Sequence, residues 1–364
     1  MALTCGIVGL PMVGKTTFFN LLTNAGIETS AFYSGKTGTN INMAVVPDER
    51  VDFLSKMFKP KKTTYAQIEF IDIPGLVRGA SQGKGTGNEF LSAVRDADAL
   101  VHILRSFENK NVVHVDDTLD ILRDLETVNM ELLFADLQLV ETRLERINSG
   151  KKKKLENPLE EVTLLKIRDV LENEQPVSSI SFTDDEKEAV KHITFLTDKP
   201  MLIVINLDEK QFTSKAYPQK DAIYAYGKEH NIIILEICAQ VEAEISQLEE
   251  EDKTIFMEDL GITEPGIDRL AKAVYRLLGL ISFLTAGEDE VKAWTIKKEL
   301  PAKKAAGKIH SDIERGFIRA EVVAFEDLKK AGSMPKAREL GLFRLEGKDY
   351  LVQDGDIINF RFNV

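Results

Sequence analysis

Cysteine is scarce in this sequence, and no long apolar run is present. Cys5 and Cys238 are the only cysteines among 364 residues, and each lies in or at the end of an apolar, strand-like run. They predict reduced thiols in a core rather than a disulfide or a metal site. A membrane span needs about 20 apolar residues, and a signal peptide needs a basic stretch followed by an apolar one. The sequence has neither, so we expect a cytoplasmic protein with no membrane partner.

Positive charge is also in deficit. The chain has 47 lysines and arginines against 59 aspartates and glutamates, which gives a formal net charge of −12. This balance does not indicate a global preference for nucleic acid, although a local basic patch can still bind it. The composition, with 43% hydrophobic and 29% charged residues, is typical of a globular protein. The length allows two or three domains.

The first motif is a glycine-rich stretch near the N-terminus. It reads GLPMVGKT from Gly9 to Thr16 and fits G-x-x-x-x-G-K-[ST], in which backbone N–H groups surround a phosphate, the lysine neutralises the outer phosphates and the hydroxyl ligates Mg²⁺. The apolar residues 3–8 before it predict a buried strand, and the residues from Thr17 onward predict a helix with its positive end at the phosphates. This order favours a phosphate-binding loop over an ordinary glycine turn. The predicted nucleotide-binding residues here are Gly9, Met12, Val13, Gly14, Lys15, Thr16 and Thr17.

A second motif follows a predicted strand over residues 66–72. In Asp72-Ile73-Pro74-Gly75, the carboxylate can hold Mg²⁺ through water and the glycine can present its N–H to the γ-phosphate. Many GTPases place after this glycine a glutamine that orients the attacking water. Leu76 stands there instead and can neither donate nor accept a hydrogen bond. Catalysis is therefore expected to be slow or to use another group.

Three further residues are candidates for a role at the phosphates. The polar residues 26–40 predict a loop in which Thr37 or Thr39 could supply a second Mg²⁺ hydroxyl, and the alternative is a plain loop. His114 follows a predicted strand over residues 99–104 and could reach the nucleotide once the switch segments close. The alternative is that His114 is a surface histidine on a loop, and the residues alone favour this alternative.

A base-recognition box follows the predicted strand over residues 200–206. GTPases have N-K-x-D at this place, whereas this chain has Asn206-Leu207-Asp208-Glu209. Glutamate moves the acceptor outward by one methylene, and paired hydrogen bonds lose selectivity when geometry slips. Strict guanine use is therefore disfavoured and the base preference stays open. After the last predicted strand, residues 232–239, Ala239 is expected to offer its backbone N–H to the base.

The remaining segments predict an arm and a small domain. Leucine, valine and isoleucine recur at alternating spacings of four and three, which predicts a coiled-coil seam: Leu133, Leu137, Val140, Leu144 and Ile147. A second helix is predicted over residues 159–171 and a third from Thr183. The lysines of residues 151–154 at the tip are a solvated loop or a contact for a phosphate backbone.

The sequence pattern of the C-terminal part differs from that of the arm. Helices are expected through Leu284, a loop over residues 299–307, and strands over residues 316–325 and 350–364. Asp354-Gly355 is expected to be the turn of a terminal hairpin. The predicted domains are 1–117 with 200–284 for nucleotide binding, 118–199 for an antiparallel coiled-coil arm, and 285–364 for a β-rich domain.

Taken together, these segments resemble the YchF family, also called Obg-like ATPases, over essentially the whole chain. The resemblance is carried by CGIVGLPMVGKTT, FIDIPGLVRGAS, GNEFL, SFEN, CAQVEAEI, AWT, GKIHSDIERGFIRAEV and EGKDYLVQDGDIINFRFNV, and by the N-x-x-E box. It implies an α/β fold with a Ras-like P-loop NTPase domain, an inserted helical arm and a C-terminal TGS domain of β-grasp shape. It also implies hydrolysis of ATP, often with GTP tolerated, and binding to ribosomes.

The resemblance assigns roles to residues as well. His114 falls where the family has its proposed substitute for the missing glutamine, so the predicted catalytic residues are Lys15, Gly75 and His114. The motifs predict that Thr16 and Asp72 hold Mg²⁺, with Thr37 as a further candidate from the loop that the resemblance itself does not assign. Asn206, Leu207, Glu209 and Ala239 would frame the base. The implied partners are ATP or ADP and the ribosome through its large subunit, with RNA contacts through the arm and the TGS domain, and the chain is expected to be a monomer.

Three departures from the family pattern are present. Met12 replaces the asparagine expected to ligate K⁺, which puts potassium dependence in question. Residues 36–40 read KTGTN rather than the usual Thr-Ile-Glu-Pro-Asn, and Pro74 replaces alanine. Two other functions remain open: a binding module whose nucleotide turnover is incidental, favoured by Leu76, and a strict GTPase.

Overall fold

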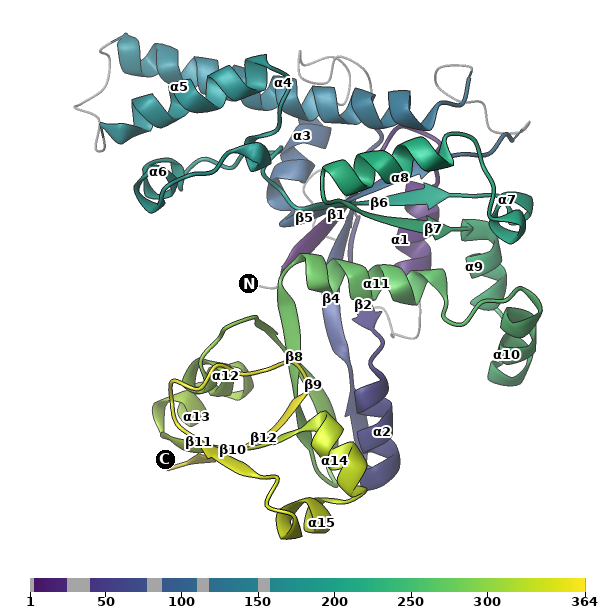
Figure 1. The fold of residues 1–364 in the computed structure, drawn as a ribbon, viewed down its shortest axis with the longest axis vertical. Coiled ribbons are helices and arrows are strands. Elements are labelled where there is room, and N and C mark those ends of the chain that lie inside the picture. The colour runs from purple at the N-terminus through teal and green to yellow at the C-terminus, as the bar shows by residue number, and fades with distance from the viewer. Residues whose placement is uncertain (1–2, 25–39, 77–86, 110–117, 150–157, 364) are drawn as a thin grey trace. The chain divides into compact units, whose positions relative to one another are not determined.

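The structure, a computed structural model, describes residues 3–24, 40–76, 87–109, 118–149 and 158–363 (Figure 1). These residues form two compact units, Met1–Asn42 with Glu69–Ile267 and Met43–Ile68 with Asp268–Val364. Among the helices in the described ranges, none is long and apolar enough to cross a bilayer. Thr37, Thr39, His114 and the lysines of residues 151–154 lie outside the described residues.

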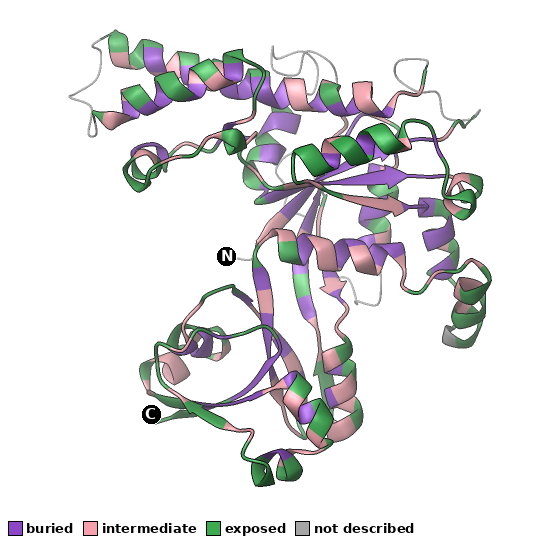
Figure 2. Ribbon diagram, in the orientation of Figure 1, coloured by how far each residue is buried: buried purple, intermediate pink, exposed green. Residues whose placement is uncertain are grey.

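The first unit is built on a six-stranded sheet with the order β2-β4-β1-β5-β6-β7. Its strands are β1 Thr4–Val8, β2 Asn40–Val46, β4 Ala66–Asp72, β5 Ala99–Arg105, β6 Met201–Asn206 and β7 Ile233–Ile237. The pairs β1–β4, β1–β5, β5–β6 and β6–β7 are parallel. Every residue of β5 is buried, as the purple strand in Figure 2 shows, because helices cover a parallel sheet on both faces. Parallel strands end at a common edge, where α/β sheets bind ligands.

Six helices of the described chain, besides those of the arm described below, belong to this unit: α1 Lys15–Asn24, α3 Gly87–Asp96, α7 Glu209–Ser214, α8 Lys220–Glu229, α9 Ala239–Ile245 and α10 Glu250–Asp259. The helix α11 Gly266–Leu277 begins at the end of this unit, and its residues from Asp268 onward belong to the second unit. Side-chain caps fix some of the helix starts: Asp208 forms a capping box with Gln211 at the start of α7. The buried carboxylate of Glu242 accepts a 2.7 Å hydrogen bond from the N–H of Gly266 at the start of α11. Such caps satisfy N–H groups that a helix leaves unpaired.

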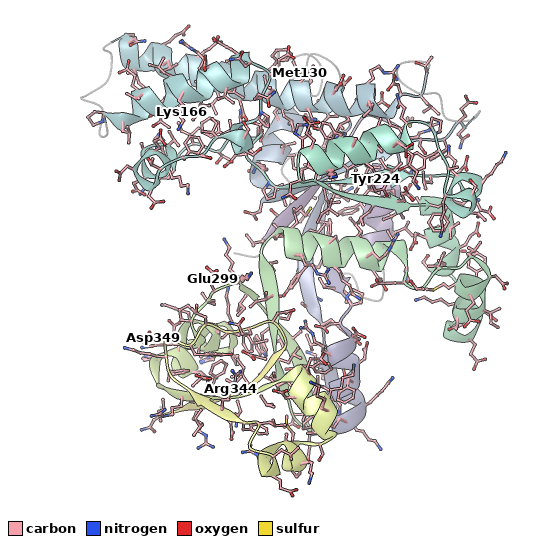
Figure 3. The ribbon with its side chains drawn as sticks, in the orientation of Figure 1. Met130, Lys166, Tyr224, Glu299, Arg344 and Asp349 are labelled. Carbon is pink, nitrogen blue, oxygen red and sulfur yellow. The ribbon has the colours of Figure 1, made fainter. Side chains whose placement is uncertain are left out.

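The arm consists of α4 Ile121–Asn148, α5 Leu159–Glu172, a 3₁₀ turn at Val177–Ser179 and α6 Asp184–Val190. The predicted seam is confirmed: Leu133, Val140 and Leu144 share a buried cluster with residues of α5, and Leu137 and Ile147 pack against it. Figure 1 shows α4 and α5 side by side. Thr183 caps α6 as predicted, in a capping box with Glu186. Lys166 of α5, labelled in Figure 3, donates a 3.0 Å hydrogen bond to that glutamate.

The second unit has its own six-stranded sheet with the order β11-β10-β12-β8-β9-β3. Its elements are α2 Glu49–Phe58, β3 Lys62–Thr64, β8 Leu280–Ala286, β9 Glu290–Lys297, α12 Ala302–Ile309, α13 Ser311–Arg315, β10 Phe317–Ala324, α14 Phe325–Ala331, α15 Met334–Glu339, β11 Arg344–Glu346 and β12 Asp356–Phe362. Its core gathers Phe283 of β8, Val322 of β10, Phe360 of β12 and three alanines of α12. The short strand β3 pairs in parallel with β9.

Three expectations for the C-terminal part are wrong. Residues 280–284 are not helical but belong to β8, which pairs antiparallel with β9 and buries Phe283 and Leu284. Residues 302–309 are not a loop but α12, because alanine favours helix and Ala302, Ala305 and Ala306 form its buried face.

The terminal hairpin is the third wrong expectation. β12 pairs with β10 and, in parallel, with β8, and β11 pairs with β10. Asp354 and Gly355 therefore form a turn before β12 without joining two neighbouring strands. Gly355 has φ +84° there, a conformation that favours glycine.

Candidate nucleotide-binding site

The site begins with Lys15, the first residue of α1. Its ammonium donates a 2.8 Å hydrogen bond to the carbonyl of Leu10, so the side chain reaches back across the loop that precedes the helix. Lys15 is only 7% exposed, and burial lowers its pKa to about 8, while the charge of Asp72 acts in the opposite direction. A poorly solvated ammonium of this kind binds strongly to a phosphate oxygen that replaces the carbonyl.

The loop conformation requires its glycines. Gly9 and Gly14 have φ values of +147° and +104°, which side chains rarely adopt. A Cβ atom at Gly14 would lie 2.6 Å from the amide nitrogen of Asn206, and one at Gly9 would lie 2.6 Å from the carbonyl of Ile103. Met12 also has a positive φ, +62°, and its side chain is 66% exposed. Asn206 and Ile103 therefore lie close against the glycines of the loop, whereas the side chain of Met12 faces solvent.

Thr16 and Asp72 form the candidate metal pair. The Thr16 hydroxyl donates a 3.0 Å hydrogen bond to a carboxylate oxygen of Asp72. The register of β1 with β4, which places Ile7 opposite Asp72, brings the carboxylate beside the loop. Burial raises the pKa of Asp72, opposed by the Thr16 hydrogen bond and the charge of Lys15. One carboxylate and one hydroxyl fit Mg²⁺, which in P-loop sites takes its other ligands from phosphates and water.

Gly75 lies beside Lys15. A Cβ atom at this position would be 3.2 Å from the ammonium nitrogen and 3.1 Å from the Cα of Pro11. The next residue, Leu76, donates its N–H to the carbonyl of Gly9 at 3.2 Å, and its side chain is 1% exposed. The side chain that replaces the usual glutamine therefore lies in the core.

The base box is tied to the loop through Asn206. Its amide nitrogen donates to the carbonyl of Val13 at 3.0 Å, and its amide oxygen accepts a 3.3 Å hydrogen bond from the N–H of Ala239. Leu207 is 2% exposed and packs in a core cluster with Leu104 and Tyr217. Glu209 is exposed at the start of α7. Asn206 thus ties the box to the loop and to α9, and Glu209 is the exposed side chain of the box.

The structure adds a link that the sequence did not reveal. The buried guanidinium of Arg105, at the end of β5, donates to the carbonyls of Phe107 at 2.9 Å and Met12 at 3.4 Å. Ser106 and Gln211 exchange two hydrogen bonds, each 2.8 Å long. The segment that leads toward His114 is therefore held to both the loop and α7. In the sequence, the only local indication of a role for Arg105 and Ser106 is their position at the end of a predicted strand.

These features define a P-loop nucleoside triphosphatase. The family model MMR_HSR1, described as "50S ribosome-binding GTPase", matches residues 4–136, and the model YchF-GTPase_C, described as "Protein of unknown function (DUF933)", matches residues 280–363. The chain is 47% identical to the "Ribosome-binding ATPase YchF" of Bacillus subtilis and 41% identical to that of Escherichia coli O157:H7, with all of each chain covered. The solved structure of the Schizosaccharomyces pombe YchF GTPase is 31% identical, with a TM-score of 0.85 over 99% of this chain and 97% of that one.

The chain therefore belongs to the YchF family. The resemblance inferred from the motifs is confirmed, and so is the α/β fold class with a P-loop domain, a helical arm and a C-terminal domain of the family.

Proposed function

We propose that this protein is a ribosome-binding ATPase that hydrolyses ATP to ADP and phosphate, tolerates GTP and changes its affinity for the ribosome with the bound nucleotide. The observation that carries the proposal is the convergence of Lys15, Thr16, Asp72 and Gly75 at one edge of the parallel sheet. The names of the relatives, which describe ribosome-binding ATPases, support it. The ribosomal contact would be to the large subunit, with the chain acting as a monomer.

Each residue has a distinct role in this proposal. Lys15 and the N–H groups of the loop hold the phosphates, and the N–H of Gly75 contacts the γ-phosphate. Thr16 and Asp72 hold Mg²⁺, and Thr37 would add a second hydroxyl. When bound, Mg²⁺ neutralises charge on the β- and γ-phosphate oxygens. His114 would position the attacking water, because Leu76 is buried and cannot.

The base slot supports ATP use with GTP tolerated. Asn206 holds Val13 and Ala239 in fixed positions, while Glu209 places its carboxylate one methylene farther out than aspartate would. A paired fit to guanine is weakened by that shift. The exposed Met12 thioether is a poor ligand for a hard cation such as K⁺, so we propose Mg²⁺ as the required ion.

Phosphate release by the full-length chain tests this proposal. We expect slow ATP turnover by the wild type, competition by GTP only at higher concentration, and loss of turnover in His114→Ala without loss of ATP affinity. Unchanged turnover in His114→Ala would show that His114 is a surface histidine with no role in hydrolysis.

Ribosome affinity provides the second test. Affinities that differ between an ATP analogue and ADP support a switch, since a ligand shifts an equilibrium only by its differential binding. Equal affinities would favour the alternative, a binding module whose turnover is incidental.

A further inference from the structure

A groove of about 570 Å³ lies within the second unit, at a place where two neighbouring strands part. β12 pairs in parallel with β8, and within the described ranges this pairing is confined to Ile357 with Leu284. β8 ends at Ala286 and turns toward β9, whereas β12 continues through Phe362. Residues from both strand ends line the groove. It therefore lies in the gap that opens between β8 and β12.

Half-buried apolar side chains reach this groove from both faces of the sheet. Ile309 of α12 and Ile313 of α13 line it from the face that packs the core of the unit. Met334 lines it from α15. That helix lies on the opposite face, because its Arg338 pairs with Glu321, which alternates in β10 with residues of the core cluster. Side chains of both faces meet here because the sheet is interrupted.

The gap also leaves main-chain groups of β12 without a neighbouring strand in the part of the chain that the structure describes. β12 pairs with β10 in an antiparallel ladder along its length. In such a ladder, alternate residues direct their N–H and C=O groups to the partner, and the residues between them direct theirs to the other side. From Ile358 onward, that other side is the groove. An unpaired strand edge of this kind can accept a further strand.

Carboxylates predominate among the charged side chains of the groove. The charged residues that line it are Glu288, Asp289, Glu290, Glu321 and Arg338. Glu321 is only 5% exposed and pairs with Arg338 at 2.6 Å, so these two charges offset each other. The charge that remains is that of the acidic turn between β8 and β9.

Lysines of the same unit neutralise this turn only in part. Lys61 pairs with Asp289 at 2.7 Å, but the two side chains are 82% and 88% exposed, and such a pair contributes little. Lys62 lies 3.8 Å from Glu290. Glu288 is exposed and forms no ion pair with a described residue. The turn therefore presents negative charge to a ligand in the groove.

We propose that this groove binds an extended peptide segment of a protein partner, and that this segment carries both basic and apolar side chains. The segment would add to β12 as a strand, so that main-chain hydrogen bonds supply affinity and side-chain contacts supply specificity. Its apolar side chains would pack against the apolar lining, and its basic side chains would meet the acidic turn. The same carboxylates repel a phosphate backbone, which disfavours an RNA strand here. This inference concerns the second unit and does not depend on the proposed nucleotide chemistry.

The test measures binding of fluorescent peptides of about six residues, a usual strand length, to the full-length chain by fluorescence anisotropy. One peptide alternates lysine with valine, and a second alternates glutamate with valine. A third is the lysine peptide with methylated main-chain nitrogens, which removes its main-chain donors. We expect the lysine peptide to bind and the other two to bind at least about tenfold more weakly, because one meets like charge and the other loses several hydrogen bonds.

Two variants locate the binding in the groove. Phe362→Ser removes a lining side chain that is 42% exposed and should weaken the lysine peptide about three- to tenfold. Glu288→Gln should weaken it about two- to fivefold. Glu299→Gln, at an exposed glutamate outside the lining that is labelled in Figure 3, is the matched control for charge. Leu345→Ser, at a 55% exposed leucine of the edge strand β11, is the control for loss of an apolar side chain.

Four results would overturn the proposal. The first is no binding of the lysine peptide. The second is binding of the glutamate or the methylated peptide as tight as that of the lysine peptide, because charge or strand addition would then play no part. The third is loss of binding in Leu345→Ser but not in Phe362→Ser, which would move the peptide to β11. The fourth is self-association in analytical ultracentrifugation that Phe362→Ser abolishes, which would assign the groove to a second copy of the chain.

Two controls keep the outcome decisive. Unchanged melting temperature and ATP affinity in both groove variants will show that the fold and the nucleotide site are intact. If Phe362→Ser fails to fold, Glu288→Gln decides alone, because its exposed side chain has no ion pair in the described ranges to lose. Wild-type affinity for the lysine peptide in Glu288→Gln would then contradict the proposal.

Discussion

The hydroxyl of Thr16 and the carboxylate of Asp72 are joined by a 3.0 Å hydrogen bond across 56 positions of the sequence. The contact exists because β1 and β4 are parallel neighbours, so the residue after the loop and the residue that ends β4 meet at one edge. Both side chains offer oxygen, the ligand that Mg²⁺ prefers. We therefore propose that the pair contributes two of the protein's ligands to a magnesium site.

Thr16→Ala should lower ATP turnover about 10- to 100-fold at limiting Mg²⁺, because one ligand to a charged centre is worth about 1.5–3 kcal/mol. Thr16→Ser keeps the hydroxyl and is the matched control. The measurement is phosphate release as a function of Mg²⁺ concentration. Equal Mg²⁺ requirements in Thr16→Ala and Thr16→Ser would remove Thr16 from the metal site.

Asn206→Ala should destabilise the protein by about 1–3 kcal/mol, since it leaves the Val13 carbonyl and the Ala239 N–H without their side-chain partner. ATP affinity should fall with it, because both the loop and the base slot lose a support. Urea unfolding and nucleotide titration measure the two effects. Asn206→Asp keeps the acceptor for Ala239 but not the donor to Val13. If Asn206→Asp loses as much stability and affinity as Asn206→Ala, the whole contribution of the side chain comes from its hydrogen bond to Val13. A variant with wild-type stability and affinity would contradict the bridging role.

Leu76→Gln should not create a faster hydrolase, although it installs the residue that many GTPases have. The Leu76 side chain is 1% exposed, and burying an unpaired amide costs about 1–3 kcal/mol. We expect a lower melting temperature and unchanged or reduced turnover, with Leu76→Met as a control of similar volume. Faster ATP hydrolysis in the glutamine variant would show that this position faces the phosphates.

His102 should make the protein acid-sensitive. It is fully buried in β5, neither ring nitrogen has a partner among the described residues, and burial, together with the charge of Lys15, lowers its pKa to about 3. The unfolded chain, with a histidine pKa of about 6.5, binds a proton that the native state excludes. The stability from this site is complete above pH 6.5 and is lost toward pH 3, by about 1.4 kcal/mol for each pH unit.

Unfolding of His102→Leu between pH 7 and 5 measures this effect. The leucine variant should have the flatter profile, whereas a variant of the exposed His230 should follow the wild type. Parallel profiles for the wild type and His102→Leu would refute the assignment.

The sequence predicted the parts of the site that are local patterns. The loop from Gly9 to Thr16, the carboxylate that ends β4 and the box at Asn206 each combine a short motif with a strand, and parallel strands bring their ends together. The seam of α4 was equally visible because its period is that of a helix.

The features that were missed depend on contacts between distant segments. Nothing near residues 62–64 signals that β3 pairs with β9, and the apolar residues 280–284 suit a helix as well as a strand until β9 lies beside them. The link of Arg105 to Met12 and that of Ser106 to Gln211 likewise join positions with no shared motif. Residues 302–309 resemble a loop in sequence because they follow Pro301 and contain lysines, but their alanines favour a helix and pack as its buried face.

The affinity for ATP of the wild type and of Lys15→Ala, measured by displacement of a fluorescent nucleotide, tests the central claim most directly. Lys228→Ala, at an exposed lysine of α8, is the control. The buried ammonium of Lys15 lies across the loop, so its removal should lower the affinity at least tenfold while the control stays unchanged. If Lys15→Ala binds ATP as tightly as the wild type, the triphosphate is not held by this loop.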